Sequence, residues 1–313
     1  MKIRFYNARI MTMTDGCDLF SGELWVENDR ILYIGDGSDL DDFYKRTGKD
    51  CIVWDREIDC EGNVLMPGFK NAHTHSAMVA MRSFADDMPL QEWLNTKIFP
   101  LEAKMTDQDN YDLTQLAILE YLTSGVTSIF DMYLSPKDIA QACVDMGMRC
   151  VLVSGLNQFG PALEVMEERY LNLNKMHPLI TYMMGVHAEY TCPKELLEQV
   201  SGLIHKYQAP LFAHMSETKK ETDECVERYG LTPPALFDSL SVRLRRRRIS
   251  LCVFHGRGYG PVRKEGPACD HQSRLQHQAG ERHRAHHPFS GKRNQRGDRD
   301  GRRFQQQLSG HVP

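Results

Sequence analysis

The stretch Met66-Pro67-Gly68-Phe69-Lys70-Asn71-Ala72-His73-Thr74-His75 continues an apolar, strand-like segment and carries two histidines two residues apart. On an extended chain, side chains at positions i and i+2 point to the same side. Both imidazoles can therefore reach one ion at the end of a strand. Because neutral imidazole is a common ligand for zinc and similar metals, His73 and His75 are candidate metal ligands, although a lone His-x-His also arises often by chance.

Strand-like and helix-like patterns alternate on the carboxyl side of this stretch. The sequence predicts strands over 126–130, 149–153, 179–186 and 210–213, and helices over 106–123, 136–146, 165–176 and 194–207. Such alternation implies parallel strands joined by crossover helices. At this chain length it favours a (β/α)8 barrel of the TIM type, whose active sites lie at the carboxyl ends of the strands. His75, His187 and His214 fall at such ends.

The first long helix, predicted over 106–123, has a clear amino-terminal signal. Thr106 can cap it, and acidic residues occupy its first turn. Its predicted apolar face consists of Leu113, Leu116, Ile118, Leu119 and Leu122.

The motif Pro67–His75 closely resembles the first metal-binding strand of the amidohydrolase superfamily. Within that superfamily it is most similar to the deaminases of 5-methylthioadenosine and S-adenosylhomocysteine, which are related to guanine and cytosine deaminases and to triazine hydrolases. The resemblance implies a barrel of the metal-dependent hydrolase type and makes His73 and His75 the first two ligands of a divalent ion, expected to be zinc.

The run His214-Met215-Ser216-Glu217 is a weak signal alone, but it follows a buried-type strand. In the resembled family a His-x-x-Glu at this place gives another ligand and an acid, so the resemblance makes His214 the third metal ligand. It makes Glu217 the residue that transfers a proton to the ring nitrogen during deamination. A carboxyl that is partly desolvated near a metal can have a pKa suited to this task.

Two further residues are expected to bind substrate on the same resemblance. His187 would contact the substrate directly, although a satisfied core histidine at a strand end is an equally common reading. Glu102 would hold the ribose hydroxyls of an adenosine-type substrate, although a solvated glutamate is the simpler alternative. Trp93 is a weaker candidate for a pocket wall.

Three regions are expected. Residues 1–57 read as short strands, over 3–6, 22–26 and 30–34, that form part of a small flanking β-sandwich or, alternatively, an independent hairpin module. Residues 58–240 form the barrel with its metal site. That barrel is incomplete, because only about five of the eight strands are recognised.

Residues 241–313 differ sharply from the rest of the chain. They contain 17 of the 38 Lys and Arg but only 5 of the 42 Asp and Glu, which gives this segment a formal charge of +12 and the remainder −16. All 16 Met precede residue 241. The segment also lacks apolar periodicity, so it is predicted to be an aberrant, disordered basic tail.

The tail lacks two elements of the resembled family, a strand-end histidine and a metal-binding aspartate in Thr-Asp-Gly. Neither follows His214, and Arg299-Asp300-Gly301 is not accepted as the equivalent because no strand precedes it. We interpret the tail as translated out of frame. When residues 241–313 are translated back into their possible codons and these are read in the frame shifted by one nucleotide, they permit a family-like sequence. In that frame the missing histidine falls at Ser250-Leu251 and the missing aspartate at Gly301-Arg302.

The resemblance predicts an enzyme that deaminates 5-methylthioadenosine, S-adenosylhomocysteine or adenosine and uses one divalent ion, with little activity left in the chain as written. A guanine, cytosine or triazine hydrolase, or a non-catalytic module with a basic tail, are the alternatives. Nine cysteines without a CxxC pair and no apolar run of membrane length favour a cytoplasmic protein without a membrane partner. Nucleic-acid binding is not expected, and a homo-oligomer is left open.

Overall fold

The computed structural model describes residues 1–16, 18–48, 51–85, 87–240 and 250–253. For residues 250–253 it describes the backbone course alone. The predicted tail, 241–313, therefore lies outside the described residues apart from this short piece.

The amino-terminal region forms a mixed sheet in the order β3-β2-β1-β4, with β5 also paired to β1. Its strands are β1 (Lys2–Ile10), β2 (Phe20–Glu27), β3 (Arg30–Gly35), β4 (Arg56–Asp59) and β5 (Val64–Leu65). β1 is antiparallel to β2 and parallel to β4 and β5. The three strands predicted from sequence lie inside β1, β2 and β3.

A helix that the sequence reading missed, α1 (Leu40–Thr47), belongs to this region. Its acidic first turn, basic last turn and left-handed Gly48 cap are favourable helix-end features. The helix buries Phe43 in an aromatic cluster with Trp25 and Tyr33. The prediction of strands alone was wrong here, because it overlooked Leu40, Phe43 and Tyr44, which stand at helical spacing and pack in the same cluster.

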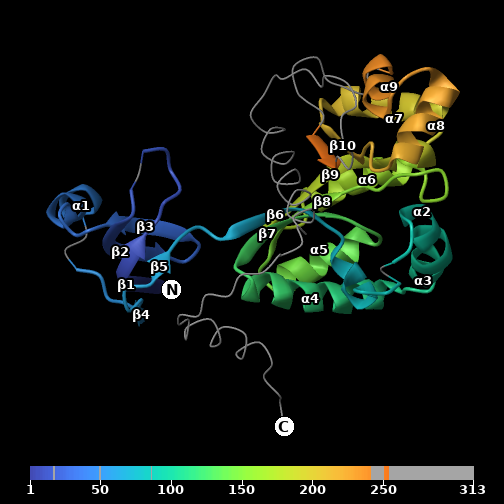
Figure 1. The fold of residues 1–313 in the computed structure, drawn as a ribbon. Coiled ribbons are helices and arrows are strands. Elements are labelled where there is room, and N and C mark those ends of the chain that lie inside the picture. Colours follow the sequence, from blue (N-terminus) through green and yellow to red (C-terminus); the bar gives the residue numbers. More distant parts are fainter. Residues whose placement is uncertain (17, 49–50, 86, 241–249, 254–313) are drawn as a thin grey trace, which may run out of the picture. The chain divides into compact units, whose positions relative to one another are not determined.

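Within the described ranges, the second sheet has six parallel strands in the order β11-β10-β9-β8-β7-β6. They are β6 (Phe69–Thr74), β7 (Val126–Met132), β8 (Arg149–Val153), β9 (Ile180–Ala188), β10 (Leu211–His214) and β11 (Ser250–Val253). Figure 1 shows β6 to β10 side by side in a curved sheet, with α4, α5 and α6 along one side of it. The fold is an incomplete TIM-type barrel, as predicted.

Helices connect these strands, and the four predicted ones lie near their predicted positions: α4 (Asp107–Thr123), α5 (Pro136–Asp145), α6 (Leu163–Leu173) and α7 (Lys194–Tyr207). The sequence reading did not predict the others, which are η1 (Ser76–Met81), α2 (Leu90–Trp93), η2 (Leu94–Ile98), α3 (Phe99–Glu102), η3 (Glu189–Thr191), α8 (Lys219–Tyr229) and α9 (Pro233–Ser239). β8 and α7 match their predicted bounds. None of the helices in the described ranges combines the length and apolarity needed to cross a membrane.

The parallel sheet is buried on both faces, which is typical of α/β proteins. Ile129, Cys150 and Leu152 pack against the helices. Met132, Val153 and Phe212 pack together in a separate cluster. Residues of β7 and β8 thus alternate between the two faces. His214 follows Phe212 at the i+2 position of β10.

Helix α4 begins as predicted but buries a different face. Thr106 accepts a hydrogen bond from the Asp109 amide and completes a capping box. The predicted apolar face was wrong in part: Leu116, Leu119 and Leu122 are 46, 52 and 45 % exposed, whereas Ile118, which was also predicted, is buried. The other buried side chains of the helix are Asn110, Thr114 and Ala117. Small and internally bonded polar side chains allow α4 to lie close to its neighbours, as where Thr114 donates to the Asn110 carbonyl.

Candidate metal centre

Strand ends position the three candidate metal ligands. His73 lies in β6, His75 directly follows it, and His214 is the last residue of β10. Because the sheet is parallel, the carboxyl ends of its strands share one edge. Residues 139 or more positions apart in the sequence therefore meet.

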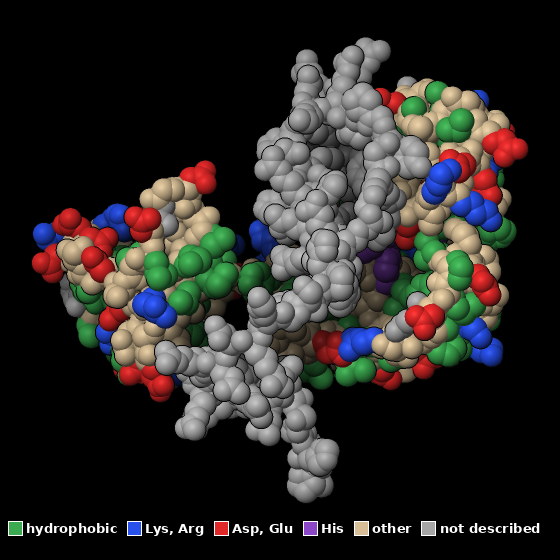
Figure 2. Space-filling model, in the orientation of Figure 1, with side chains coloured by type: hydrophobic (Ala, Val, Ile, Leu, Met, Phe, Trp, Pro, Cys, Tyr) green, Lys and Arg blue, Asp and Glu red, His purple; other side chains and the backbone are tan. Residues whose placement is uncertain are grey.

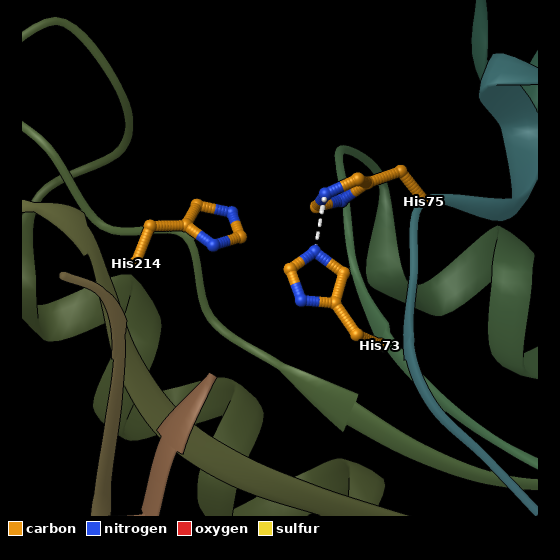
Figure 3. A group of neighbouring side chains, drawn as sticks. All are labelled: His73, His75 and His214. Atoms are coloured by element: carbon orange, nitrogen blue, oxygen red, sulfur yellow. Dashed lines mark hydrogen bonds between the residues drawn. The ribbon is translucent and has the colours of Figure 1, made fainter. Parts of the chain in front are cut away.

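The three imidazoles converge on one point (Figure 3). One ring nitrogen from each of His73, His75 and His214 lies within 4.8 Å of the others. The Nε2 atoms of His73 and His75 are 3.1 Å apart. Two nitrogens bound tetrahedrally to zinc at about 2.1 Å would be about 3.4 Å apart. The spacing therefore fits two ligands of one ion.

Hydrogen bonding leaves the correct ring nitrogens available. The Met132 carbonyl, which can only accept, lies 2.6 Å from His75 Nδ1, so Nδ1 carries the proton and Nε2 keeps its lone pair. His214 Nδ1 is buried and has no hydrogen-bond partner in the described part of the chain. An orphaned buried nitrogen beside two other imidazoles is well suited to a divalent metal ion.

Burial favours the neutral form of His75 and His214, which is the form that binds metal. Desolvation, together with the neighbouring His75, His187 and His73, lowers the pKa of His214 to about 2. Desolvation also lowers the pKa of His75, against the opposing effect of its bond to Met132.

His187, on β9, lies beside the three candidate ligands. Its ring centroid is 5.4 Å from that of His214, and its Nδ1 is 3.1 Å from the Thr191 hydroxyl. Burial, followed by the charge of His75, lowers the pKa of His187 to about 4. The structure thus brings His187 together with the histidine group.

Glu217 lies in the turn after β10 and is half-buried. Burial raises the pKa of Tyr190 to about 12, and the charge of Glu217 adds to that shift. The Tyr190 ring centroid is 5.9 Å from that of His187. The Glu221 carboxylate accepts the Glu217 amide at 2.7 Å and the Ser216 amide at 3.0 Å. This turn is therefore held from α8, with Ser216 at a φ of 54°.

Glu102 is the last residue of α3 and reaches the same end of the sheet through Tyr133. Burial raises the pKa of Glu102, and a hydrogen bond with Tyr133 opposes that shift. The Tyr133 ring centroid is 6.5 Å from that of His75. Trp93 and His75 line one hollow of about 380 Å³. Figure 2 shows histidine side chains at the surface of the face drawn.

Sequence reasoning missed several residues around the histidines. Asp131 is 0 % exposed, and burial raises the pKa of its carboxyl to about 7. The predicted strand stopped at Phe130; extending it by two residues would have placed Asp131 at a strand end. Tyr121, Tyr133 and Glu221 gave no sequence signal.

The Thr-Asp-Gly motif occurs once in the sequence, at Thr14–Gly16. It lies between β1 and β2 of the amino-terminal sheet and not at a strand end of the barrel. Asp15 is therefore not a counterpart of the family's metal-binding aspartate. Arg299–Gly301 lies outside the described residues.

A parallel β/α half-barrel with histidines converging at its carboxyl edge defines a barrel protein with a divalent-metal centre. The model of the amidohydrolase family matches residues 64–242, more than half of the chain. The chain therefore belongs to the amidohydrolase family.

Curated relatives support the same family assignment. A 5-methylthioadenosine/S-adenosylhomocysteine deaminase of Syntrophomonas wolfei is 41 % identical over 207 residues, covering 64 % of this chain and 48 % of the relative. The protein of that name from Desulfitobacterium hafniense is 38 % identical over 241 residues, 75 % of this chain and 54 % of the relative. The chain thus spans about half the length of the curated relatives it matches.

A solved structure is similar in fold. An adenosine deaminase from Xanthomonas campestris with bound zinc superposes with a TM-score of 0.68 at 27 % identity, over 77 % of this chain and 55 % of that chain.

Proposed function

We propose that the protein encoded by the intact reading frame is a metal-dependent aminohydrolase that removes the exocyclic amine of an adenosine-type nucleoside and releases ammonia. The observation that carries this proposal is the convergence of His73, His75 and His214, with His187 beside them. The names of the relatives support the choice of 5-methylthioadenosine, S-adenosylhomocysteine or adenosine as substrate.

We propose one ion, zinc, at this centre. Three neutral imidazoles with nitrogens mutually within 4.8 Å leave room for a single shared ion, and the Xanthomonas deaminase is described with bound zinc. When bound, such an ion supplies Lewis-acid activation of water.

The roles of the surrounding residues follow from their chemistry. In this proposal Glu217 carries the proton to the purine ring nitrogen next to the reacting carbon, which general acid catalysis requires. His187 hydrogen-bonds the bound base, oriented by Thr191. Glu102, steadied by Tyr133, accepts hydrogen bonds from the ribose hydroxyls.

We also propose that the region boundaries are 1–57, 58–240 and 241–313 and that the last region is out of frame. The change in charge near residue 241 supports this, as does the end of the family match at residue 242. Sequencing the coding DNA tests it. A one-nucleotide shift near codon 241 should open a frame that runs past codon 313 and encodes the missing histidine and aspartate; a closed frame would refute the idea.

Ammonia release tests the proposed activity directly. The frame-restored chain should deaminate at least one of the three nucleosides when zinc is supplied. Glu217→Gln should lower its turnover by about 10²–10⁴-fold. The 313-residue chain should show no useful turnover, because it lacks the aspartate expected to act as fourth ligand and base.

The same assay separates the rival functions. Turnover of guanine, cytosine or a triazine without turnover of any nucleoside would favour another hydrolase of this family. Salt-dependent nucleic-acid binding that survives His73→Ala, without any turnover, would favour the basic-tailed module. We place the protein in the cytoplasm because the six cysteines whose side chains the structure describes are free thiols, four of them buried; cell fractionation tests this.

A further inference from the structure

The two neighbours of His75 are both held by one tyrosine. The Tyr121 hydroxyl, on α4, lies 2.5 Å from Thr74 Oγ1 and 3.1 Å from Ser76 Oγ. Thr74 and Ser76 are the residues before and after His75. One tyrosine hydroxyl on α4 therefore contacts both chain neighbours of this metal ligand.

A buried carboxylate completes the arrangement. Both Asp131 oxygens lie 3.3 Å from the Ser76 amide nitrogen, which donates to them. Ser76 is 2 % exposed and Asp131 is 0 % exposed. The next residue on β7, Met132, accepts the Nδ1 proton of His75 at 2.6 Å. The ring of His75 and the backbone beyond it are thus both anchored to the end of β7.

These contacts act where the chain would otherwise be least constrained. Within the described residues, β6 pairs with β7 alone, and regular strand structure ends at Thr74. His75 itself has φ −133° and ψ 78° as the chain turns into η1. A ligand at such a turn needs fixed neighbours if its Nε2 is to stay aimed at His73 and His214.

A purely stabilising role explains this network poorly. Burying a carboxylate costs free energy unless it is well paired. Apolar side chains would hold α4 against the sheet without that desolvation cost. Directed hydrogen bonds from outer residues, in contrast, are a common means of fixing a metal ligand's orientation.

We propose that Tyr121 and Asp131 are positioning residues that hold His75 in its metal-binding orientation. The inference rests on the metal centre of the proposed function and extends it to residues that touch neither metal nor substrate. It predicts that removing one phenolic oxygen, more than 40 residues away in sequence, weakens metal binding.

Zinc affinity of the full 313-residue chain, measured by competition with a chromophoric chelator, tests this without needing turnover. Tyr121→Phe keeps the ring and removes the hydroxyl. It should raise the zinc dissociation constant about tenfold, the lower end of the effect typical of outer-shell partners. Tyr111→Phe is the matched control, because Tyr111 lies on the same helix and donates to Asp145 away from the histidines.

A spectroscopic signature distinguishes positioning from stability. The Co(II)-loaded Tyr121→Phe chain should show an altered visible absorption spectrum, while Tyr111→Phe should match the unaltered chain. Asp131→Asn retains one acceptor oxygen and should be less impaired than Asp131→Ala. Tyr121→Phe provides the test if either Asp131 variant fails to fold.

One result would overturn the inference alone: wild-type zinc affinity and a wild-type Co(II) spectrum in Tyr121→Phe, whether or not its melting temperature falls. Failure of the unaltered chain to bind zinc at all would instead overturn the proposed metal centre, and this inference with it.

Discussion

The Nε2 atoms of His73 and His75 lie 3.1 Å apart, as closely as two ligands of one tetrahedral zinc ion. Alternation along β6 places both rings on one side of the chain, and the bond from His75 to Met132 fixes the tautomer of the second ring. This pair and His214 form the proposed metal centre, and the roles proposed for the surrounding residues depend on it.

Replacing a member of this group should abolish tight metal binding. His73→Ala removes one of three nitrogens that share an ion, so zinc affinity should fall by at least about 100-fold. Chelator competition measures it. His177→Ala is the matched control, because His177 precedes β9 at the opposite end of the strand and its Nδ1 accepts the Leu179 amide. Equal losses in both variants would show that the effect is not specific to the centre.

The strand-end residues could be predicted from the sequence because their position depends only on the direction of the strands. In a parallel sheet every carboxyl end reaches the same edge, so His75, His187 and His214 could be grouped without knowing their distances. Strands β7 to β10 were also foreseen, since each is a short apolar run between helical patterns, and β6 was foreseen from the strand-like segment that carries His73 and His75.

The network behind His75 could not be predicted in the same way. Tyr121 contacts Thr74 across 47 positions, and that contact depends on which face α4 turns to the sheet. The leucine pattern indicated the wrong face, because hydrophobicity alone ignores how closely Asn110, Thr114 and Ala117 allow the helix to approach.

The ion pair between α8 and the segment after β9 should contribute strongly to stability. Arg228 Nη2 lies 2.9 and 2.8 Å from the Glu189 oxygens, and the Glu189 side chain is 1 % exposed. Arg228→Met leaves this carboxylate buried without its cation, which should lower the unfolding free energy by about 3 kcal/mol. Chemical denaturation measures it.

Lys206→Met provides the contrast. Lys206 pairs with Glu167 at 2.6 Å, but the two side chains are 61 and 27 % exposed. A pair in that setting should contribute at most about 1 kcal/mol. Similar losses from both substitutions would mean that Glu189 is not truly desolvated.

Glu221 should make stability depend on pH. Burial raises its pKa from 4.5 to about 7 in the folded chain. The folded state therefore binds more protons between these values, and the contribution of Glu221 is complete below pH 4.5 and lost as the pH rises towards 7. Relative to Glu221→Gln, the unaltered chain should lose up to about 1.4 kcal/mol per pH unit in this window.

Urea denaturation at several pH values measures that difference. Glu227→Gln, at an exposed position of the same helix, is the matched control for the loss of one carboxylate from α8. A constant difference for Glu221→Gln would contradict the raised pKa.

Zinc-edge anomalous diffraction from crystals of the zinc-loaded chain tests the central claim most directly. The account predicts one anomalous peak at about 2.1 Å from a ring nitrogen of each of His73, His75 and His214. The peak should be absent from crystals of His73→Ala grown under the same conditions. Zinc bound elsewhere, or no zinc among these three imidazoles, would contradict the account.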